Sequence, residues 1–435
     1  MSKFEAFGAA GGGHAELVGG RVNVPVVLGG EVPYVNLDYA ASAPCLRRVA
    51  DRVTEVLPWY ASVSRGAGHL SFVATSLYES ARATVHEFVG ARDDDVVIFT
   101  RNTTDSLNLL ASVVPDQAEV LFLDIEHHAD LLPWQRGNGR AITAGSTIAE
   151  TLVELERALE RGSTTLVAVT GASNVTGEMV PLKTVAALAH KHGARISVDG
   201  AQLAPHRRID MGDLDIDYLA LSGHKCYAPF GAGVLVGRRD WLDAAPAYLA
   251  GGGAVKRVTI ESTQWAPSPD RHEAGSPNLV GAVALAEATV SLAELMSDGL
   301  VADHDASLRD QLLDGIAGME RIHPLRIWDD SEDAVGIVAF EVEGYDAALV
   351  AAYLSCEHGI GVRAGKFCAH PLLNRINHGA SAVRASFGLG TTAEDIDRLL
   401  LALRQLTTTG IRRTYVERDG WLSPDEDVRP TAFPK

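Results

Sequence analysis

Lys225 and the three residues before it, Ser222, Gly223 and His224, are the strongest indication of chemistry in this sequence. They follow an apolar run over residues 216–221 and precede a glycine-rich turn. Burial at the end of a strand disfavours the ammonium form of a lysine and makes its amine more nucleophilic. Flanked by hydroxyl and imidazole donors, such a lysine suits a Schiff base with a phosphorylated aldehyde cofactor. A surface lysine that closes a strand is the alternative, and these four residues alone do not decide between the two.

An acidic residue upstream fits the same cofactor. Asp199 ends an apolar strand predicted over residues 196–199 and lies 26 positions before Lys225. Its carboxylate would point out of the carboxyl edge of a sheet, where α/β sheets bind ligands. Pyridoxal 5'-phosphate (PLP) needs an acid beside its pyridine nitrogen, because the protonated ring stabilises a substrate carbanion. An aspartate at a strand end is more often a turn or cap residue, but the pairing with Lys225 favours a cofactor site.

With these residues in place, the chain resembles a fold-type I PLP enzyme of aminotransferase class V. It is most similar to the group II cysteine desulfurase and selenocysteine lyase branch. The resemblance implies an α/β fold with a large, mostly parallel sheet domain and a smaller C-terminal α+β domain. Each matching block is weak alone, but all of them occur in the family order: residues 37–44, 99–104, 126–128, 173–177, 196–202, 222–225, 273–278 and 363–369.

Two threonines are candidates for binding the cofactor phosphate. Thr103 and Thr104 precede an apolar-periodic segment and therefore occupy a predicted helix N-terminus, where free amides and the helix dipole attract anions. An ordinary helix cap is the alternative. The resemblance adds Ser222 and His224 to the same phosphate, and Ser276 to the phosphate bound by a partner subunit.

The resemblance also assigns residues around the cofactor ring. His127 would stack on the ring and shuttle protons, since a neutral imidazole is both an apolar plate and a base. Asn174 and Gln202 would hydrogen-bond the phenolic oxygen, although either could instead be a loop amide. A metal site at the His127–His128 pair is not expected, because the neighbouring acids form no ligand motif. The chain's four cysteines form no Cys-x-x-Cys pair either.

Substrate-binding residues follow from the same resemblance. Arg384 is the candidate clamp for an amino-acid carboxylate, because a guanidinium offers two parallel donors to a carboxylate. Asn174 would assist it at the substrate. The family builds its sites at a dimer interface, so a homodimer is implied, and Arg65 would enter the neighbouring subunit's site.

Cys368 decides between chemistries. In the desulfurases a mobile-loop cysteine attacks the substrate's sulfur, and the nearby cations Arg363 and Lys366 would favour its thiolate. Group II enzymes usually carry two histidines before this cysteine, whereas this chain has Lys366 and Phe367. The alternative is that Cys368 is a small packing residue in a loop inherited from a desulfurase ancestor.

Two further departures from the family pattern accompany this one. Residues 387–390 read Phe-Gly-Leu-Gly where the desulfurases have bulkier aromatic residues, and we expect the glycines to give flexibility and space near the substrate. Asp130 stands where the family commonly has asparagine. Together the departures indicate a substrate larger than free cysteine or differently charged.

The leading functional hypothesis is PLP-dependent cleavage of a carbon–sulfur bond in L-cysteine or a cysteine S-conjugate. Lys225 would hold the cofactor and move the α-proton, Asp199 would sustain the electron sink, and Cys368 would accept sulfur. One alternative is an aminotransferase, epimerase or decarboxylating enzyme of a specialised pathway, since one cofactor serves all these reactions. Another is a non-catalytic sulfur-transfer scaffold, against which the Asp199–Lys225 pair argues.

Composition bounds the remaining possibilities. The 435 residues are 46% hydrophobic and carry a formal net charge of -18, which opposes nucleic-acid binding. The longest apolar runs fall short of a membrane span, and four scattered cysteines fit a cytoplasmic location. The acidic run of residues 210–217 is predicted to be a turn and not a calcium loop. We expect an N-terminal arm, a large PLP-binding domain, a small C-terminal domain and a C-terminal tail over residues 1–35, 36–295, 296–409 and 410–435.

Overall fold

A seven-stranded sheet carries most of the residues singled out above. The computed structural model describes residues 15–20, 22–64, 66–418 and 420–429. The strand order is β4-β10-β9-β8-β7-β5-β6, and only β10 runs against its neighbours. The carboxyl ends of the other six strands therefore meet at one edge. The strands are β4 (Asp95–Thr100), β5 (Glu119–Leu123), β6 (Asn138–Ile142), β7 (Thr164–Thr170), β8 (Arg195–Asp199), β9 (Tyr218–Ser222) and β10 (Gly233–Arg238).

Helices cover both faces of this sheet, which is why its strands read as continuous apolar runs. In β7, Val167 and Val169 pack into one hydrophobic core, whereas Leu166 and Ala168 pack into another on the opposite face. One core contains α2 (His69–Phe88), α5 (Ile148–Leu159), α6 (Leu182–Lys191) and α9 (Leu279–Ser297). The other contains α3 (Thr103–Val113), α4 (His128–Gln135) and α8 (Arg239–Ala244).

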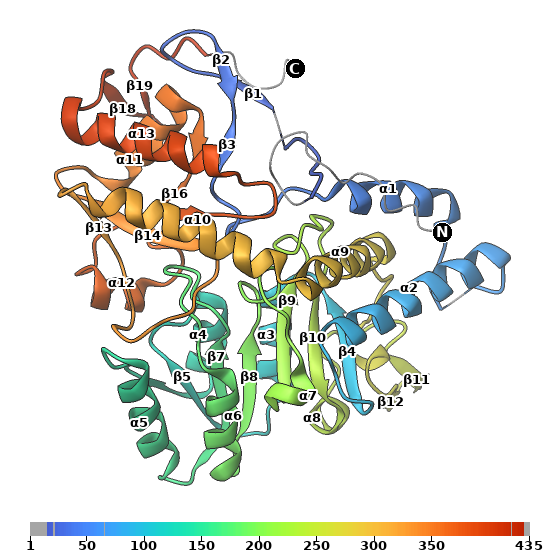
Figure 1. The fold of residues 1–435 in the computed structure, drawn as a ribbon. Coiled ribbons are helices and arrows are strands. Elements are labelled where there is room, and N and C mark those ends of the chain that lie inside the picture. The colour runs from blue at the N-terminus through green and yellow to red at the C-terminus, as the bar shows by residue number, and fades with distance from the viewer. Residues whose placement is uncertain (1–14, 21, 65, 419, 430–435) are drawn as a thin grey trace.

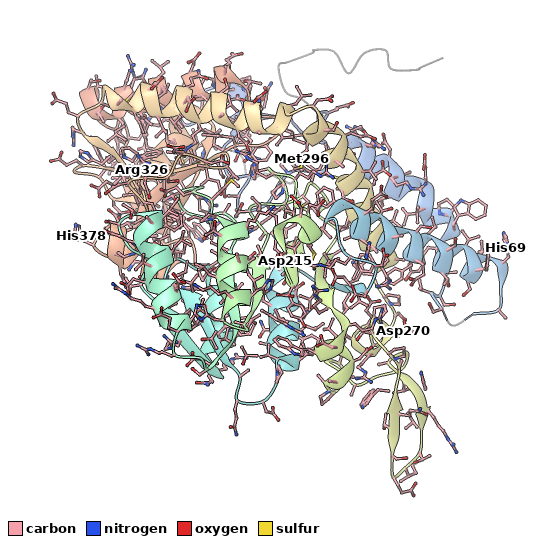
Figure 2. The ribbon with its side chains drawn as sticks, turned by 60° about the horizontal axis from the view of Figure 1, so that its bottom comes forward. His69, Asp215, Asp270, Met296, Arg326 and His378 are labelled. Carbon is pink, nitrogen blue, oxygen red and sulfur yellow. The ribbon has the colours of Figure 1, made fainter. Side chains whose placement is uncertain are left out.

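A second unit contains an antiparallel sheet of four strands in the order β13-β14-β17-β16. Its helices α10, α11 and α13 pack into a core of their own, whereas α12 packs into the core of the large sheet. Figure 1 shows the long helix α10 running from the large sheet to this unit, and Met296 lies at the bend between α9 and α10 (Figure 2). The elements are α10 (Leu300–Ala317), β13 (Ile322–Pro324), β14 (Ile337–Val342), α11 (Ala347–His358), β16 (Arg363–Gly365), α12 (His370–Ile376), β17 (Ala382–Ser386) and α13 (Ala393–Thr409).

The start of the chain joins this second unit. After the hairpin β1 (Asn23–Pro25) and β2 (Glu31–Pro33), strand β3 (Val35–Asn36) pairs in parallel with β15 (Ile360–Gly361). Val35 and Leu37 lie in the core of the second unit. α1 (Arg47–Val56) then packs beside α9.

Two hairpins lie outside the sheets. β11 (Val255–Val258) and β12 (Thr263–Trp265) form a hairpin that projects from the body of the molecule beyond Asp270 (Figure 2). Near the chain end, β18 (Tyr415–Arg418) and β19 (Trp421–Pro424) form a hairpin that packs on α11. The sequence analysis did not foresee this second hairpin. The four domain boundaries given above stay predictions.

Two minor expectations differ from what the structure shows. α9 is long and apolar enough to cross a membrane, so the statement that all apolar runs fall short of a span is wrong. However, 61% of its most apolar stretch is buried inside the protein, which fits a core helix. The acidic run, expected to be a turn, instead contains a one-turn helix, α7 (Met211–Leu214), because the side chain of Asp210 caps it by accepting from the Asp213 amide.

Candidate active site

A cavity of about 270 Å³ lies where the carboxyl edge of the large sheet faces the second unit. Thr103, His127, Asn174, Asp199 and Lys225 each end or closely follow a different strand at that edge. Of the predicted site residues that the structure describes, all except Ser276 line the cavity: Thr103, Thr104, His127, Asn174, Asp199, Gln202, Ser222, His224, Lys225, Cys368 and Arg384. Ser276 is exposed on the turn before α9, and Arg65 lies outside the described residues.

Lys225 and Asp199 both line the cavity, and their opposite charges influence one another. Asp199, the last residue of β8, is only 4% exposed and accepts a hydrogen bond from the Ala201 amide at 2.9 Å. Burial raises the pKa of Asp199, whereas the Lys225 charge opposes that rise. Burial likewise lowers the pKa of Lys225, against the attraction of Asp199. A lysine with a lowered pKa presents more of its neutral, nucleophilic amine.

Three hydroxyl-bearing residues, Thr103, Thr104 and Ser222, form what we call the hydroxyl cluster of the cavity. α3 begins at Thr103, as predicted, and is capped by the side chain of Asn102. The Oγ atoms of Thr103 and Ser222 are buried and have no hydrogen-bond partner within the described chain. Gly233, opposite Ser222 in β10, lets the chain of Asn102 approach, because a Cβ there would lie 2.6 Å from its Cα.

His127 is neutral in this structure. It caps α4, and its Nδ1 accepts a hydrogen bond from the Ala129 amide at 3.0 Å. Burial, followed by the Lys225 charge, lowers the pKa of His127 to about 3. The hydrogen of the neutral ring is therefore assigned to Nε2. A neutral imidazole of this kind can lie against an uncharged ring and exchange a proton.

Two amide side chains link the cavity wall to other parts of the chain. Gln202 donates from Nε2 to the Ala40 carbonyl at 2.8 Å, and its buried Oε1 has no hydrogen-bond partner in the part of the chain that the structure describes. Asn174 donates from Nδ2 to the Phe367 carbonyl at 2.7 Å. Asn174 thus holds the backbone beside Cys368, and no local pattern in the sequence indicates this contact.

Arg384 lies in β17 and reaches the cavity from the second unit. It is 4% exposed, and it donates to the Asn174 carbonyl at 2.9 Å and to Asp38 at 3.0 Å. Its Nε has no partner among the described residues, and the guanidinium lies 5.2 Å from the centre of the Phe367 ring. Arg363 also lines the cavity, with Asp38 at 3.9 Å. The arrangement places two cations at the cavity wall, both close to the carboxylate of Asp38.

Cys368 lies on a short loop over residues 366–369, which we call the thiol loop. Phe367 and Cys368 have φ values of 51° and 54°, a left-handed conformation that costs energy for residues other than glycine. The loop is held by the His128 amide, which donates to the Cys368 carbonyl at 2.8 Å. The Cys368 side chain is exposed and lines the cavity, and it interacts electrostatically with both Lys225 and Arg384.

One expectation about the departures is wrong. Gly388 and Gly390 do not open space near the cavity, because the ring of Tyr39 fills that space. A Cβ at Gly388 would lie 2.2 Å from Tyr39, and the adjacent Leu389 amide donates to the Tyr227 hydroxyl at 2.9 Å. Asp130 is also absent from the cavity wall and is fully buried. Of the three departures, only that at Lys366–Phe367 brings a residue, Phe367, to the cavity.

Sequence reasoning missed three contributors to the site. Asp38, Asn102 and Phe367 belong to the matching blocks, but no role was assigned to them. The N-cap preference of asparagine before a predicted helix could have identified Asn102. The ion pair of Asp38 with Arg384 spans 346 positions of sequence, so no local signal exists for it.

Known proteins are similar to this chain over most of its length. The family model of aminotransferase class-V matches residues 35–399. A cysteine desulfurase of Dickeya dadantii is 36% identical over 386 residues, which cover 86% of this chain and 92% of that protein. A cysteine desulfurase of Haloferax volcanii is 34% identical and covers 89% of this chain and 92% of its own length.

Solved structures give the same result. The apo cysteine desulfurase of Thermococcus onnurineus superposes with a TM-score of 0.79 at 30% identity, covering 86% of this chain and 95% of that chain. The Escherichia coli cysteine desulfurase CsdA, in an S-sulfonic acid form, gives a TM-score of 0.76 at 31% identity over 86% and 94% of the two chains. The predicted fold class is confirmed.

Proposed function

The chain belongs to the aminotransferase class-V family, and we propose that it uses PLP to cleave the carbon–sulfur bond of L-cysteine. One observation carries the proposal: a single cavity contains a deprotonatable lysine, a buried arginine and an exposed thiol, Lys225, Arg384 and Cys368. These are the groups needed to activate an amino acid, to orient its carboxylate and to take its sulfur. The cysteine desulfurases to which the chain is similar support the same reaction.

The cavity suits the cofactor by its unsatisfied polar atoms. Three buried atoms, the Oγ atoms of Thr103 and Ser222 and the Oε1 of Gln202, have no hydrogen-bond partner among the described residues. This arrangement is costly unless a ligand supplies the partners. The helix N-terminus at Thr103 and the two hydroxyls would hold a phosphate, and Lys225 would hold the aldehyde carbon. When bound, PLP supplies an electron sink for the carbanion formed on the amino acid.

The chain's own residues then handle protons and charge. Asp199 would face the ring nitrogen, and its negative charge would favour protonation there. Lys225, with its lowered pKa, would remove the substrate's α-proton as a neutral amine and return it afterwards. His127 would donate or accept a proton at Nε2 while its Nδ1 remains bound to the Ala129 amide.

Arg384 would orient the substrate. Its present partners are the Asn174 carbonyl and Asp38, and its Nε remains available for a carboxylate oxygen. Because Arg384 is buried, an ion pair with the substrate carboxylate is weakly screened by water. The neighbouring Arg363 would add positive charge to the same carboxylate.

Cys368 would take the sulfur. Its thiolate attacks the sulfur of the substrate cysteine, a sulfur–sulfur bond forms, and the carbon–sulfur bond breaks with its electron pair left on carbon. Protonation of that carbon gives alanine, and Cys368 is left as a persulfide. Two further thiol groups, from an acceptor or an added reductant, then release the outer sulfur as sulfide. They are oxidised together to one disulfide, and Cys368 returns to its thiol form.

Product analysis tests this function. The purified protein is incubated with L-cysteine and a thiol reductant, and sulfide, alanine and pyruvate are quantified. We expect alanine equal to sulfide, and both lost in Cys368→Ser. Cys45→Ser is the matched control, because Cys45 lies outside the cavity and a serine can keep its hydrogen bond to the Leu46 carbonyl.

A second candidate is β-elimination without a protein thiol. It is favoured by Phe367, an apolar ring beside the sulfur in the position of a family histidine. Pyruvate in place of alanine, with turnover intact in Cys368→Ser, would contradict the desulfurase proposal and favour this one.

A homodimer is proposed on separate grounds. Exposed apolar side chains gather in the segment from the end of α1 to the start of α2, among them Leu57, Tyr60 and Phe72, with Phe72 72% exposed. A patch of this kind indicates a protein interface, and Ser276 would then face the partner's cavity. The molar mass in solution tests it. A cytoplasmic location stays a prediction.

A further inference from the structure

Two carboxyl side chains lie beside Asp199 without lining the cavity. Glu126 follows β5, and Asp130 is in the first turn of α4, so the two flank His127 in sequence. Both residues are 0% exposed. Each interacts electrostatically with the other and with Asp199. Three acidic groups thus interact with one another in the buried region beside the cavity, and only Asp199 among them lines it.

The hydrogen bonds of these carboxyls are incomplete. Asp130 accepts one bond, from Trp134 Nε1 to Oδ1 at 3.0 Å. Its Oδ2 and both carboxyl oxygens of Glu126 are buried with no donor in the described chain. The backbone amide of Thr170 interacts with Glu126 outside hydrogen-bond geometry. Two ionised carboxylates cannot satisfy one another, because each is only an acceptor.

A proton on one of the two carboxyls would remove the repulsion between them and supply the missing hydrogen bond. Placing two unpaired carboxylates next to one another in a buried region is strongly unfavourable, so one of them must hold a proton. A protonated carboxyl has one O–H donor, which gives the facing carboxylate the bond that it lacks. Burial, and then the neighbouring negative charges, raise the pKa of both carboxyls well above their usual values.

We propose that Glu126 and Asp130 share one proton in a carboxylic acid–carboxylate hydrogen bond, and that the single negative charge of this pair is a positioning element, which helps Asp199 to hold a proton on the base that it faces. With one proton, the pair carries one negative charge beside Asp199 and favours a proton on whatever base Asp199 faces. That this base is the cofactor's ring nitrogen rests on the proposed function, whereas the shared proton does not. An asparagine at position 130 would keep the charge but remove the exchangeable acid proton.

Three variants separate the proton from the charge. Asp130→Asn and Glu126→Gln each keep one carboxylate and replace the acid by an amide donor, and the double variant removes the charge as well. Infrared difference spectra of the cofactor-free protein, in H₂O and D₂O at neutral pH, report a protonated carboxyl directly. Asp303→Asn is the matched control, because Asp303 lies in the first turn of α10 but is exposed.

We expect a protonated-carboxyl band that shifts in D₂O, present in the wild type and in Asp303→Asn and lost in both single variants. In the holoenzyme, the visible absorbance of the lysine-bound cofactor should titrate as in the wild type in both single variants. In the double variant we expect its midpoint to move to lower pH by on the order of one unit.

Two results would overturn the proposal. If the wild-type spectrum lacks the band, the claim of a shared proton is wrong. This measurement does not depend on whether any variant folds. A double variant that titrates like the wild type would remove the positioning role. Failure of the proposed function has a different signature, namely the infrared band without any turnover of L-cysteine.

Discussion

The hydroxyl cluster and the thiol loop line the same cavity, but the chain holds them in different ways. Thr103 and Ser222 end or follow strands of the large sheet, and backbone hydrogen bonds of regular elements fix them. Cys368 sits in an irregular loop in left-handed conformation, held by the Asn174 side chain and the His128 amide. The first arrangement is built to bind one group permanently. The second keeps a reactive group exposed at the cost of backbone strain.

A substitution of Lys225 tests whether the part of the site built on the large sheet is essential for turnover. We expect Lys225→Ala to lower alanine formation by at least about 10⁴-fold, because proton transfer and covalent attachment are both lost. The cofactor should become removable by dialysis. Lys191→Ala, which changes an exposed lysine on α6, is the control and should leave both properties unchanged. Retention of measurable turnover in Lys225→Ala would contradict the assigned role.

The hydroxyl cluster should govern cofactor affinity and not sulfur transfer. In Thr103→Val we expect the dissociation constant of PLP to rise about 10- to 100-fold, since a hydrogen bond to a charged group contributes about 1.5–3 kcal/mol. At saturating cofactor, the ratio of alanine to sulfide should not change. Ser112→Ala, near the other end of the same helix, serves as the control. Equal affinity in Thr103→Val and the control would remove Thr103 from the phosphate site.

An imidazole introduced at position 367 tests how the thiol loop controls the reactivity of Cys368. Phe367→His keeps a flat ring, and histidine tolerates the left-handed conformation better than most residues. A base next to the thiol should raise its reactivity, and we expect alkylation of Cys368 at neutral pH to accelerate about 3- to 10-fold. Alkylation is followed by mass spectrometry, with Phe367→Tyr as the control that keeps an aromatic ring but introduces no imidazole. An unchanged rate would mean that the ring at position 367 does not influence the thiol.

The smallest expected effect concerns pH. Because burial lowers the pKa of His127 to about 3, the unfolded chain binds a proton that the folded chain excludes as pH falls below 6.5. Stability contributed by neutral His127 is therefore present above pH 6.5 and lost on acidification. We expect His127→Gln to lose less thermal stability than the wild type between pH 7 and 5, by a few degrees in Tm. Parallel melting curves would contradict a neutral buried His127.

The sequence predicted the sheet-built part of the site better than the loop. Asp199 and Lys225 could be placed together because residues after the strands of a parallel sheet meet at one edge, whatever the rest of the chain does. The start of α3 at Thr103 was readable from local chemistry in the same way. The fold class, the family and the kind of enzyme were all confirmed.

The contacts of the second unit could not be read in this way. Asn174 binds the Phe367 carbonyl across 193 positions, and Arg384 binds Asp38 across 346, so neither pairing leaves a local pattern. The error at Gly388 has the same origin. A glycine in a loop indicates that space is needed, but only the tertiary structure reveals that the Tyr39 ring occupies it.

The pairing of β3 with β15 bears on how the protein is made. Ile360 lies opposite Val35 in the register, and the amides of Val35 and Leu37 donate to the carbonyls of Gly359 and Gly361. The second unit is therefore completed by the first strands of the chain. A ribosome delivers those strands long before their partners. The apolar side chains of Val35 and Leu37 therefore stay unpaired until Ile360 has been synthesised. The carboxylate of Asp38 likewise stays without its partner Arg384 until then. If synthesis is halted before residue 360, we expect the incomplete chains to bind chaperones that recognise exposed apolar segments, and to do so through this N-terminal segment.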